Sequence, residues 1–288
     1  MNFSEKLKDY TTKINKALLL AAEQFPKNNI VSEAMAYSLL AGGKRIRPVI
    51  AVAVAESLGG DVDEALCYGC ALEMIHTYSL IHDDLPCMDN DTLRRGIPTC
   101  HVKYGEAYAL LAGDGLLTYA FEYITKNAKD KARAFDFMAY LSSMAGIGGM
   151  VGGQTDDIGA EKVKVGIDAL KSIHARKTGA LINAAGAAGA IAAGKDASFA
   201  EGYTKSLGMA FQIKDDILDV EGDAEKMGKT LMKDMNSEKS TFVTLLGLDE
   251  AKAQLDAETK KAIEACEIFG TRKDFCISLA KAMLEREN

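Results

Sequence analysis

EMIHTYSLIHDDLPCMD (73–89) and LGMAFQIKDDILD (207–219) are two stretches in which an apolar helical run ends in crowded aspartates. Carboxylates one helical turn apart repel each other by roughly a few tenths of a kcal/mol on an exposed helix, and by more where they are partly buried. A divalent cation removes this repulsion, and Mg²⁺ in particular binds a few carboxylates together with phosphate oxygens of a substrate. The two stretches therefore predict two acidic helix ends that face each other across a magnesium site.

The pattern of apolar residues predicts helices along most of the chain. Apolar residues recur at intervals of three and four in 62–84, 103–125, 130–147, 177–193, 203–220 and 252–268. The 288 residues include only four prolines, and no hairpin signal is flanked by alternating residues. No Pro-rich or Ser/Gly-rich linker and no regular repeat divides the chain. We therefore expect an all-α fold, with residues 1–288 as a single domain of roughly ten or more helices.

Charge and composition exclude some classes of partner. The net charge of −7 gives no support to a nucleic-acid partner, whereas the local cluster GGKRIR (42–47) suits a small polyanion. The apolar stretch 17–22 is too short for a signal peptide, and no run of 18 apolar residues predicts a membrane span. The six cysteines are expected to be reduced thiols, because no secretory signal precedes them. A cytoplasmic location is therefore expected.

The first acidic stretch has the features of a phosphate site. Pro86 cannot lie deep inside a helix, so the helix should end near Leu85, and the following turn can bring Asp89 back beside Asp83. A solvated acidic helix end is a poor explanation, since carboxylates there oppose the helix dipole. The arginine pair 94–95 follows closely, and the guanidinium fork matches phosphate oxygens.

The second acidic stretch is more regular. Gln212, Asp215, Asp216 and Asp219 are spaced by three and four, which predicts that all four share one face of one helix. The apolar residues that precede them indicate that this face is partly buried.

Six motifs together resemble the trans-isoprenyl diphosphate synthase family, and they occur in order over nearly the whole chain. They are GGKRIRP (42–48), LIHDDLPCMDNDTLRRGIPTCH (80–101), GGQTDD (152–157), HARKTGALI (174–182), FQIKDDILD (211–219) and GKTLMKD with EKSTF (228–242). The two aspartate motifs are specific as a pair, and the others are weak singly. The resemblance is greatest with the bacterial farnesyl diphosphate synthases. It implies the isoprenoid synthase fold, a helical bundle around a central apolar cavity.

The resemblance also implies a role for each matching position. The implied magnesium ligands are Asp83, Asp84, Asp89, Asp215, Asp216 and Asp219. The implied allylic diphosphate site consists of Arg94, Lys177, Thr178, Gln212 and Lys229. The implied isopentenyl diphosphate site consists of Lys44, Arg47, His76 and Arg95. The residues expected to act directly in catalysis are Asp83, Asp84, Asp89, Lys177, Asp215 and Lys229.

Lys44 and Arg47 are three residues apart near a predicted helix start. We expect them to share a helix face and to hold an anion with the help of the helix dipole. The C-terminal LEREN (284–288) matches the family weakly, so no role is expected for Arg286.

The implied reaction condenses isopentenyl diphosphate with dimethylallyl or geranyl diphosphate to farnesyl diphosphate. It proceeds by ionisation, condensation and elimination: magnesium and cationic side chains stabilise the leaving pyrophosphate, and the double bond of isopentenyl diphosphate attacks the allylic cation. The site must exclude water, which an apolar cavity between helices does. Tyr78 and Ser79, five and four residues before the first aspartate, are the implied floor of this cavity, and the aromatic ring indicates a farnesyl product.

Several alternatives remain. A smaller residue at position 78 would indicate a geranylgeranyl diphosphate synthase, and a non-catalytic regulatory subunit would typically lack the aspartate motifs. A class I terpene cyclase usually has one aspartate motif and needs no isopentenyl diphosphate. A metal phosphohydrolase of the HD type would need histidines on separate helices, whereas His76 and His82 lie in one predicted helix. The relatives are usually homodimers, so a homodimer is expected, with small isoprenyl diphosphates as the other partners.

Overall fold

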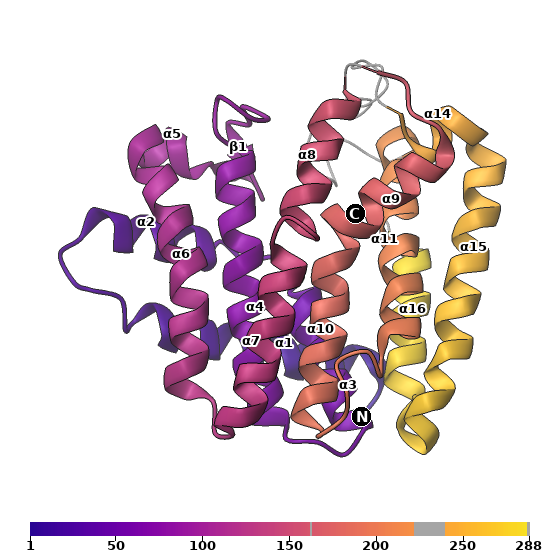
Figure 1. Ribbon diagram of the computed structural model, residues 1–288, viewed down its shortest axis with the longest axis horizontal. Helices are drawn as coiled ribbons and strands as arrows, with labels where there is room; N and C mark the ends of the chain where they lie inside the picture. Colours follow the sequence, from indigo (N-terminus) through magenta and orange to yellow (C-terminus); the bar gives the residue numbers. More distant parts are fainter. Residues whose placement is uncertain (162, 222–239, 287–288) are drawn as a thin grey trace.

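The computed structural model describes residues 1–161, 163–221 and 240–286, which form a bundle of helices (Figure 1). The elements are α1 (Phe3–Ala22), α2 (Ile30–Leu39), α3 (Ile46–Ser57), α4 (Val62–Asp83), β1 (Leu93–Arg94), β2 (Ile97–Pro98), α5 (Cys100–Tyr104), α6 (Glu106–Asn127), α7 (Lys131–Ala145), α8 (Met150–Ala160), α9 (Ile167–Lys177), α10 (Gly179–Ala192), α11 (Glu201–Glu221), α14 (Phe242–Leu246), α15 (Leu248–Ala265), the 3₁₀ helix η1 (Cys266–Arg272) and α16 (Asp274–Glu285). The predicted all-α fold is confirmed.

Helix α4 runs through the middle of the bundle and positions the first acidic motif. It begins at a capping residue, Asp61, whose side chain accepts hydrogen bonds from the backbone N–H groups of Asp63 and Glu64. It ends at Asp83, two residues before the predicted end, because Pro86 prevents a longer helix. The acidic motif therefore begins at the last turn of a firmly packed element.

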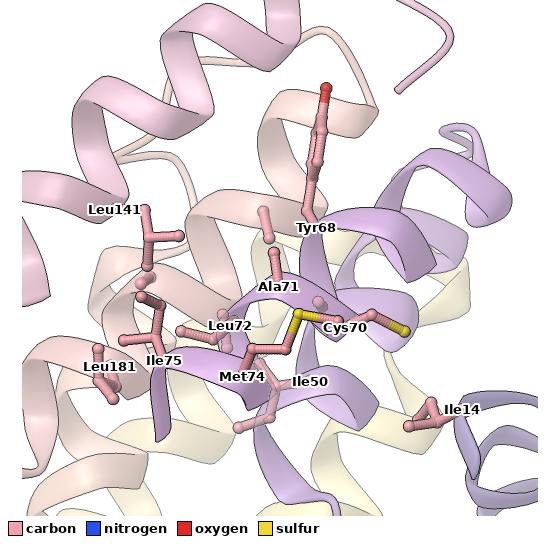
Figure 2. Close-up of a cluster of buried hydrophobic side chains, with 14 of the residues drawn as sticks. Ile14, Ile50, Tyr68, Cys70, Ala71, Leu72, Met74, Ile75, Leu141 and Leu181 are labelled. Atoms are coloured by element: carbon pink, nitrogen blue, oxygen red, sulfur yellow. The ribbon is translucent and has the colours of Figure 1, made fainter. Parts of the chain in front are cut away.

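Burial on nearly all sides explains why α4 is rigid. Its residues Tyr68, Cys70, Ala71, Leu72, Met74 and Ile75 meet Ile14, Ile50, Leu141 and Leu181 from four other helices (Figure 2). A helix that is apolar all round belongs in the core. Each fully buried Leu, Ile or Met side chain contributes about 1.5–3 kcal/mol to the free energy of unfolding. Asp83 is therefore held by the best-packed part of the molecule.

Helices α7 and α8 include an apolar stretch, although the sequence predicted no membrane span. Residues 131–160, which comprise α7 and α8, contain an 18-residue window with a mean hydropathy of 1.2, long enough to cross a membrane, and 33% of this window is buried. A single stretch of this kind is weak evidence for a span, and α7 and α8 are separated by residues 146–149. Part of the apolar character has another explanation, since Val151 and Ile158 of α8 line a cavity described below.

A short antiparallel hairpin departs from the expectation of a chain without hairpin signals. Strands β1 and β2 pair Leu93 with Pro98 and Arg94 with Ile97. The two residues between them, Arg95 and Gly96, have φ angles of 54° and 78°. Positive φ at both central residues is what a type I′ turn requires. The strands are only two residues long and the turn begins with arginine. The sequence therefore has too little pattern to predict this hairpin.

Candidate active site

Asp83 and Asp89 lie together at the end of α4. The backbone N–H of Asp89 donates to the carbonyl oxygen of Asp83 at 2.8 Å, so the chain returns to the helix end as predicted. Gln154 of α8 donates through Nε2 to Oδ1 of Asp83 at 3.0 Å. Burial raises the pKa of Asp83 to about 6, an effect that Lys177 opposes and that Asp89 increases. The ionised form of Asp83 is therefore unfavourable in the folded protein, and a bound cation would stabilise it.

Buried Asp84 forms an ion pair with Arg94, whose side chain is partly exposed. The Arg94 guanidinium donates to both carboxylate oxygens of Asp84 at 2.6–2.9 Å, and Asp84 is 3% exposed. Burial raises the pKa of Asp84, while the Arg94 guanidinium opposes that rise. The sequence predicted a metal ligand and a diphosphate-binding cation at these two positions, and the structure shows that they bind each other.

A cavity of about 360 Å³ opens beside Asp83 and continues between α4 and α8. It brings together several residues that the sequence singled out, namely Arg47, His76, Tyr78, Ser79, Asp83, Lys177 and Thr178. Its other lining includes Met88, Met150, Val151 and Ile158. The cavity is thus charged at one end and lined by apolar side chains elsewhere, which suits a ligand with a charged head and an apolar chain.

Lys177 and Thr178 lie at the junction between α9 and α10. Lys177 donates through Nζ to Oδ2 of Asp157 at 2.6 Å, and Asp157 is 5% exposed. Gln212 of α11 contacts His174 of α9 at 3.4 Å between Nε2 and Nδ1. These contacts fix the end of α9 against both α8 and α11, beside the cavity.

The aspartates of the second acidic motif bind different partners. Asp216 is buried, accepts a hydrogen bond from the backbone N–H of Phe242 at 2.8 Å, and lies 3.7 Å from Nε2 of His174. Asp215 instead binds the guanidinium of Arg286. Gln212 and Asp216 both contact His174 of α9, so they lie on the same side of α11. Asp215 and Asp216 point about 100° apart on the helix, so they lie at the two edges of the predicted face and bind different partners.

Three predicted cations and the predicted histidine line a second cavity, of about 260 Å³. Its lining includes all of the predicted isopentenyl diphosphate site, Lys44, Arg47, His76 and Arg95, together with Gly43, Arg45, Glu73, Ile182 and Phe211. The cavity adjoins the first one, since Arg47 and His76 line both.

The electrostatics of this second cavity favour an anion. Burial lowers the pKa of Arg47, Glu73 opposes that effect and Arg95 increases it. Burial and then Arg47 hold the pKa of His76 well below its ordinary value, so this imidazole is neutral at neutral pH. The Nε of Arg47 is buried and has no hydrogen-bond partner among the described residues. An incoming diphosphate would relieve the crowding of positive charge.

The predicted helix face at this cavity is wrong for Lys44. Helix α3 begins at Ile46, with Arg45 as its capping residue in the left-handed region at φ 52°. Lys44 therefore precedes the helix, while Arg47 lies in its first turn. Arg45 itself forms a buried ion pair with Glu73 at 2.8 Å, at the wall of the cavity. This pair holds the backbone from which Lys44 and Arg47 extend.

Two residues contact the site although the sequence assigned them no role. Arg286 donates to the carbonyl oxygen of Phe211 at 2.8 Å, stacks 4.0 Å from the centre of that ring, and binds Asp215. Gln154 orients Asp83, and its Oε1 is buried without a hydrogen-bond partner among the described residues. The GGQ motif was the only sequence signal for Gln154, and the weak match of LEREN was the only one for Arg286.

The residues present fit magnesium. Within residues 1–161, 163–221 and 240–286, no three His, Cys, Asp or Glu side chains are close enough together to hold a metal alone. Mg²⁺ needs only one or two carboxylates when phosphate oxygens complete its shell. Asp83, with its raised pKa, and Asp219, whose buried Oδ2 has no hydrogen-bond partner in the described chain, supply such oxygens. Lys229, the remaining predicted cation, lies outside the described residues.

Comparisons with known proteins identify the family of the chain. The sequence model of the polyprenyl synthetase family matches residues 28–273. The chain is 43% identical to farnesyl diphosphate synthase of Bacillus subtilis, over 98% of this chain and 97% of that protein. It is 42% identical to the chloroplastic geranylgeranyl pyrophosphate synthase of Capsicum annuum, over 100% of this chain and 79% of that protein. A crystal structure of an FPP/GFPP synthase from Zymomonas mobilis superposes with a TM-score of 0.85 at 36% identity, and the match covers 96% of this chain and 98% of that one. The chain therefore belongs to the polyprenyl synthetase family.

Proposed function

We propose that this protein is a magnesium-dependent farnesyl diphosphate synthase. It condenses isopentenyl diphosphate with dimethylallyl or geranyl diphosphate. The observation that supports this most directly is the pair of adjoining cavities that share Arg47 and His76. One is lined by cations, and the other runs from Asp83 past apolar side chains to Tyr78. Two diphosphates can thus be bound side by side while an apolar chain extends between the helices.

The allylic substrate is assigned to the larger cavity. Lys177, Arg94 and Lys229 would bind its diphosphate, with Thr178 and Gln212 beside it. Once bound at Asp83, Asp84, Asp89, Asp215, Asp216 and Asp219, magnesium would supply the positive charge that stabilises the departing pyrophosphate. Arg94 can serve this role only after it exchanges Asp84 for phosphate oxygens, because the two side chains are now paired.

Isopentenyl diphosphate is assigned to the smaller cavity. Lys44, Arg47, His76 and Arg95 would hold its diphosphate so that the double bond lies beside the allylic carbon. The neutral His76 can donate one hydrogen bond without adding to the positive charge. The proton lost after condensation would leave with pyrophosphate. Apolar lining residues such as Met150 and Ile158 keep water from the allylic cation.

Product analysis tests this assignment. The protein is incubated with Mg²⁺, labelled isopentenyl diphosphate and each allylic starter, and the dephosphorylated products are separated by chain length. Farnesyl is the expected main product from both dimethylallyl and geranyl diphosphate. Products formed without isopentenyl diphosphate would instead indicate a cyclase, and phosphate release without prenyl transfer would indicate a phosphohydrolase. No turnover would indicate a regulatory subunit.

Geranylgeranyl diphosphate synthase is the second candidate, because farnesyl and geranylgeranyl diphosphate synthases both match the chain over most of its length. Tyr78 favours the shorter product. Its side chain is 7% exposed and lines the larger cavity together with Ser79.

Replacing Tyr78 by Ala is expected to lengthen the products by at least one isoprene unit, because the ring no longer fills the cavity floor. Chromatography of labelled products measures the change. Ser79→Ala is the comparison variant: Ser79 also belongs to the implied floor, but its small hydroxyl, which donates to the carbonyl oxygen of His76, fills little of the cavity. We expect its products to resemble those of the unchanged protein, and equal product lengths for both variants would contradict the role of Tyr78.

The proposal includes a homodimer of single-domain chains in the cytoplasm. Exposed apolar side chains support the dimer, since Tyr108, Leu110 and Leu111 of α6 and Val102 of α5 are all exposed in the single chain. Such residues are typical of a surface that another chain covers. Light scattering during gel filtration should give about twice the chain mass of 30.9 kDa.

A further inference from the structure

His82 lies against the residue that closes the cavity floor. Its ring meets Tyr78 edge-on, with 5.7 Å between the ring centres and an angle of 77° between their planes. Both side chains line the larger cavity. The two residues are four apart on α4, so they lie one above the other on the same side of the helix. The face of Tyr78 that α4 does not cover is thus supported by a second ring.

The imidazole of His82 is itself held by α6. Its Nε2 lies 2.9 Å from the carbonyl oxygen of Leu110 and 3.9 Å from Oδ1 of Asp114. A carbonyl oxygen only accepts, so Nε2 carries the proton and donates. This hydrogen bond joins the last turn of α4 to α6 and sets the orientation of the ring.

Gly113 provides the space for this ring. A Cβ atom at position 113 would lie 2.0 Å from Nε2 and 2.4 Å from Cδ2 of His82. The ring therefore occupies a notch in α6 that only glycine leaves open. The imidazole contacts Tyr78, the Leu110 carbonyl and the Gly113 backbone, and it cannot keep this position if residue 113 is larger than glycine.

We propose that His82 is a positioning residue that determines product length through Tyr78. Anchored to Leu110 and seated on Gly113, its ring holds the Tyr78 ring across the cavity floor. Without this support Tyr78 can turn aside, and a growing chain passes it more often. The proposal rests on the proposed prenyltransferase function and adds a residue, and a helix, to the control of chain length.

A set of four variants tests it, with the ratio of longer product to main product as the readout. His82→Ala is expected to raise this ratio by about twofold to tenfold, the range that loss of an aromatic edge contact supports. Gly113→Ala should raise it similarly, because the new Cβ displaces the ring. In the double variant the second change should add little, since no ring remains to clash. His82→Gln keeps a donor for Leu110 and should give an intermediate ratio.

Gly115→Ala is the matched control on the same helix. Its Cβ would meet the side chain of Met35, with the sulfur nearest at 2.7 Å, and the flexible methionine can move. We expect its product ratio to be unchanged.

The result that overturns the inference is a ratio within experimental error of the unchanged protein for both His82→Ala and Gly113→Ala, while Tyr78→Ala lengthens the products. That outcome is distinct from failure of the proposed function, in which the unchanged protein forms no prenyl product. All ratios are measured at temperatures where circular dichroism shows each variant folded. A general loss of stability lowers total turnover and leaves the ratio alone.

Discussion

Replacing Asp83 by Asn is expected to lower kcat by about 10²–10³-fold, the size of effect seen when one group that stabilises a transition state is removed. The amide keeps the shape of the side chain, and its oxygen can still accept the hydrogen bond from Gln154. It loses the negative charge on which cation binding depends. Initial rates over a range of magnesium concentrations measure the loss, together with magnesium binding in the presence of a non-reactive diphosphate analogue.

The same variant should be at least as stable as the unchanged protein. Burial raises the pKa of Asp83 from 3.8 to about 6, so the folded state binds this proton more tightly than the unfolded state does. Ionised Asp83 therefore destabilises the ligand-free fold above pH 6, and this cost disappears as the pH falls toward 4. Removing the charge at pH 7.5 is expected to raise the free energy of unfolding on the order of 1 kcal/mol.

Asp156→Asn is the control for this prediction. Asp156 forms a surface ion pair with Arg176 and is about half exposed, so its loss should change neither kcat nor stability appreciably. The role assigned to Asp83 would be contradicted if Asp83→Asn kept kcat within tenfold of the unchanged protein. It would also fail if the lost activity were matched by a loss of folded protein in urea unfolding.

The features that could be predicted from the sequence depend on local pattern. Helix α4 follows from the apolar spacing over 62–84, and the return of Asp89 to Asp83 follows from where Pro86 stops the helix. The hairpin between Leu93 and Pro98 escaped prediction, since two-residue strands carry no periodicity.

The side-chain pairs of the site could not be predicted in the same way. Asp157 binds Lys177 across two helices, and Asp215 binds Arg286 from the far end of the chain. Both pairs depend on distances that only packing sets. The fact that Asp215 and Asp216 bind different partners has another cause. Spacing indicates which residues are near each other on a helix, but it does not reveal that Asp216 is needed to bind the backbone N–H of Phe242.

Replacing Gly153 by Ala should have the second large effect, because α8 touches the backbone of α9 at this point. A Cβ atom at position 153 would lie 2.2 Å from the backbone N and 2.7 Å from Cα of Lys177. Backbone atoms cannot turn aside as a side chain can, so the two helices must separate. We expect a loss of about 1–3 kcal/mol in the free energy of unfolding from this overpacking. We also expect kcat to fall by about 10²-fold, the cost of displacing reacting groups by 1 Å.

Gly159→Ala separates this effect from helix propensity. Gly159 lies on the same helix with no atom within 4 Å of its would-be Cβ. Alanine there should raise the free energy of unfolding by about 0.5–1 kcal/mol and leave kcat unchanged. Urea unfolding and initial rates, measured on both variants, give the comparison. Equal effects of the two substitutions would show that the contact between Gly153 and Lys177 is unimportant. Opposite effects on the free energy of unfolding would show that Gly153 is required for the close approach of α8 to α9, which places Lys177 in the same cavity as Gln154 and Asp83.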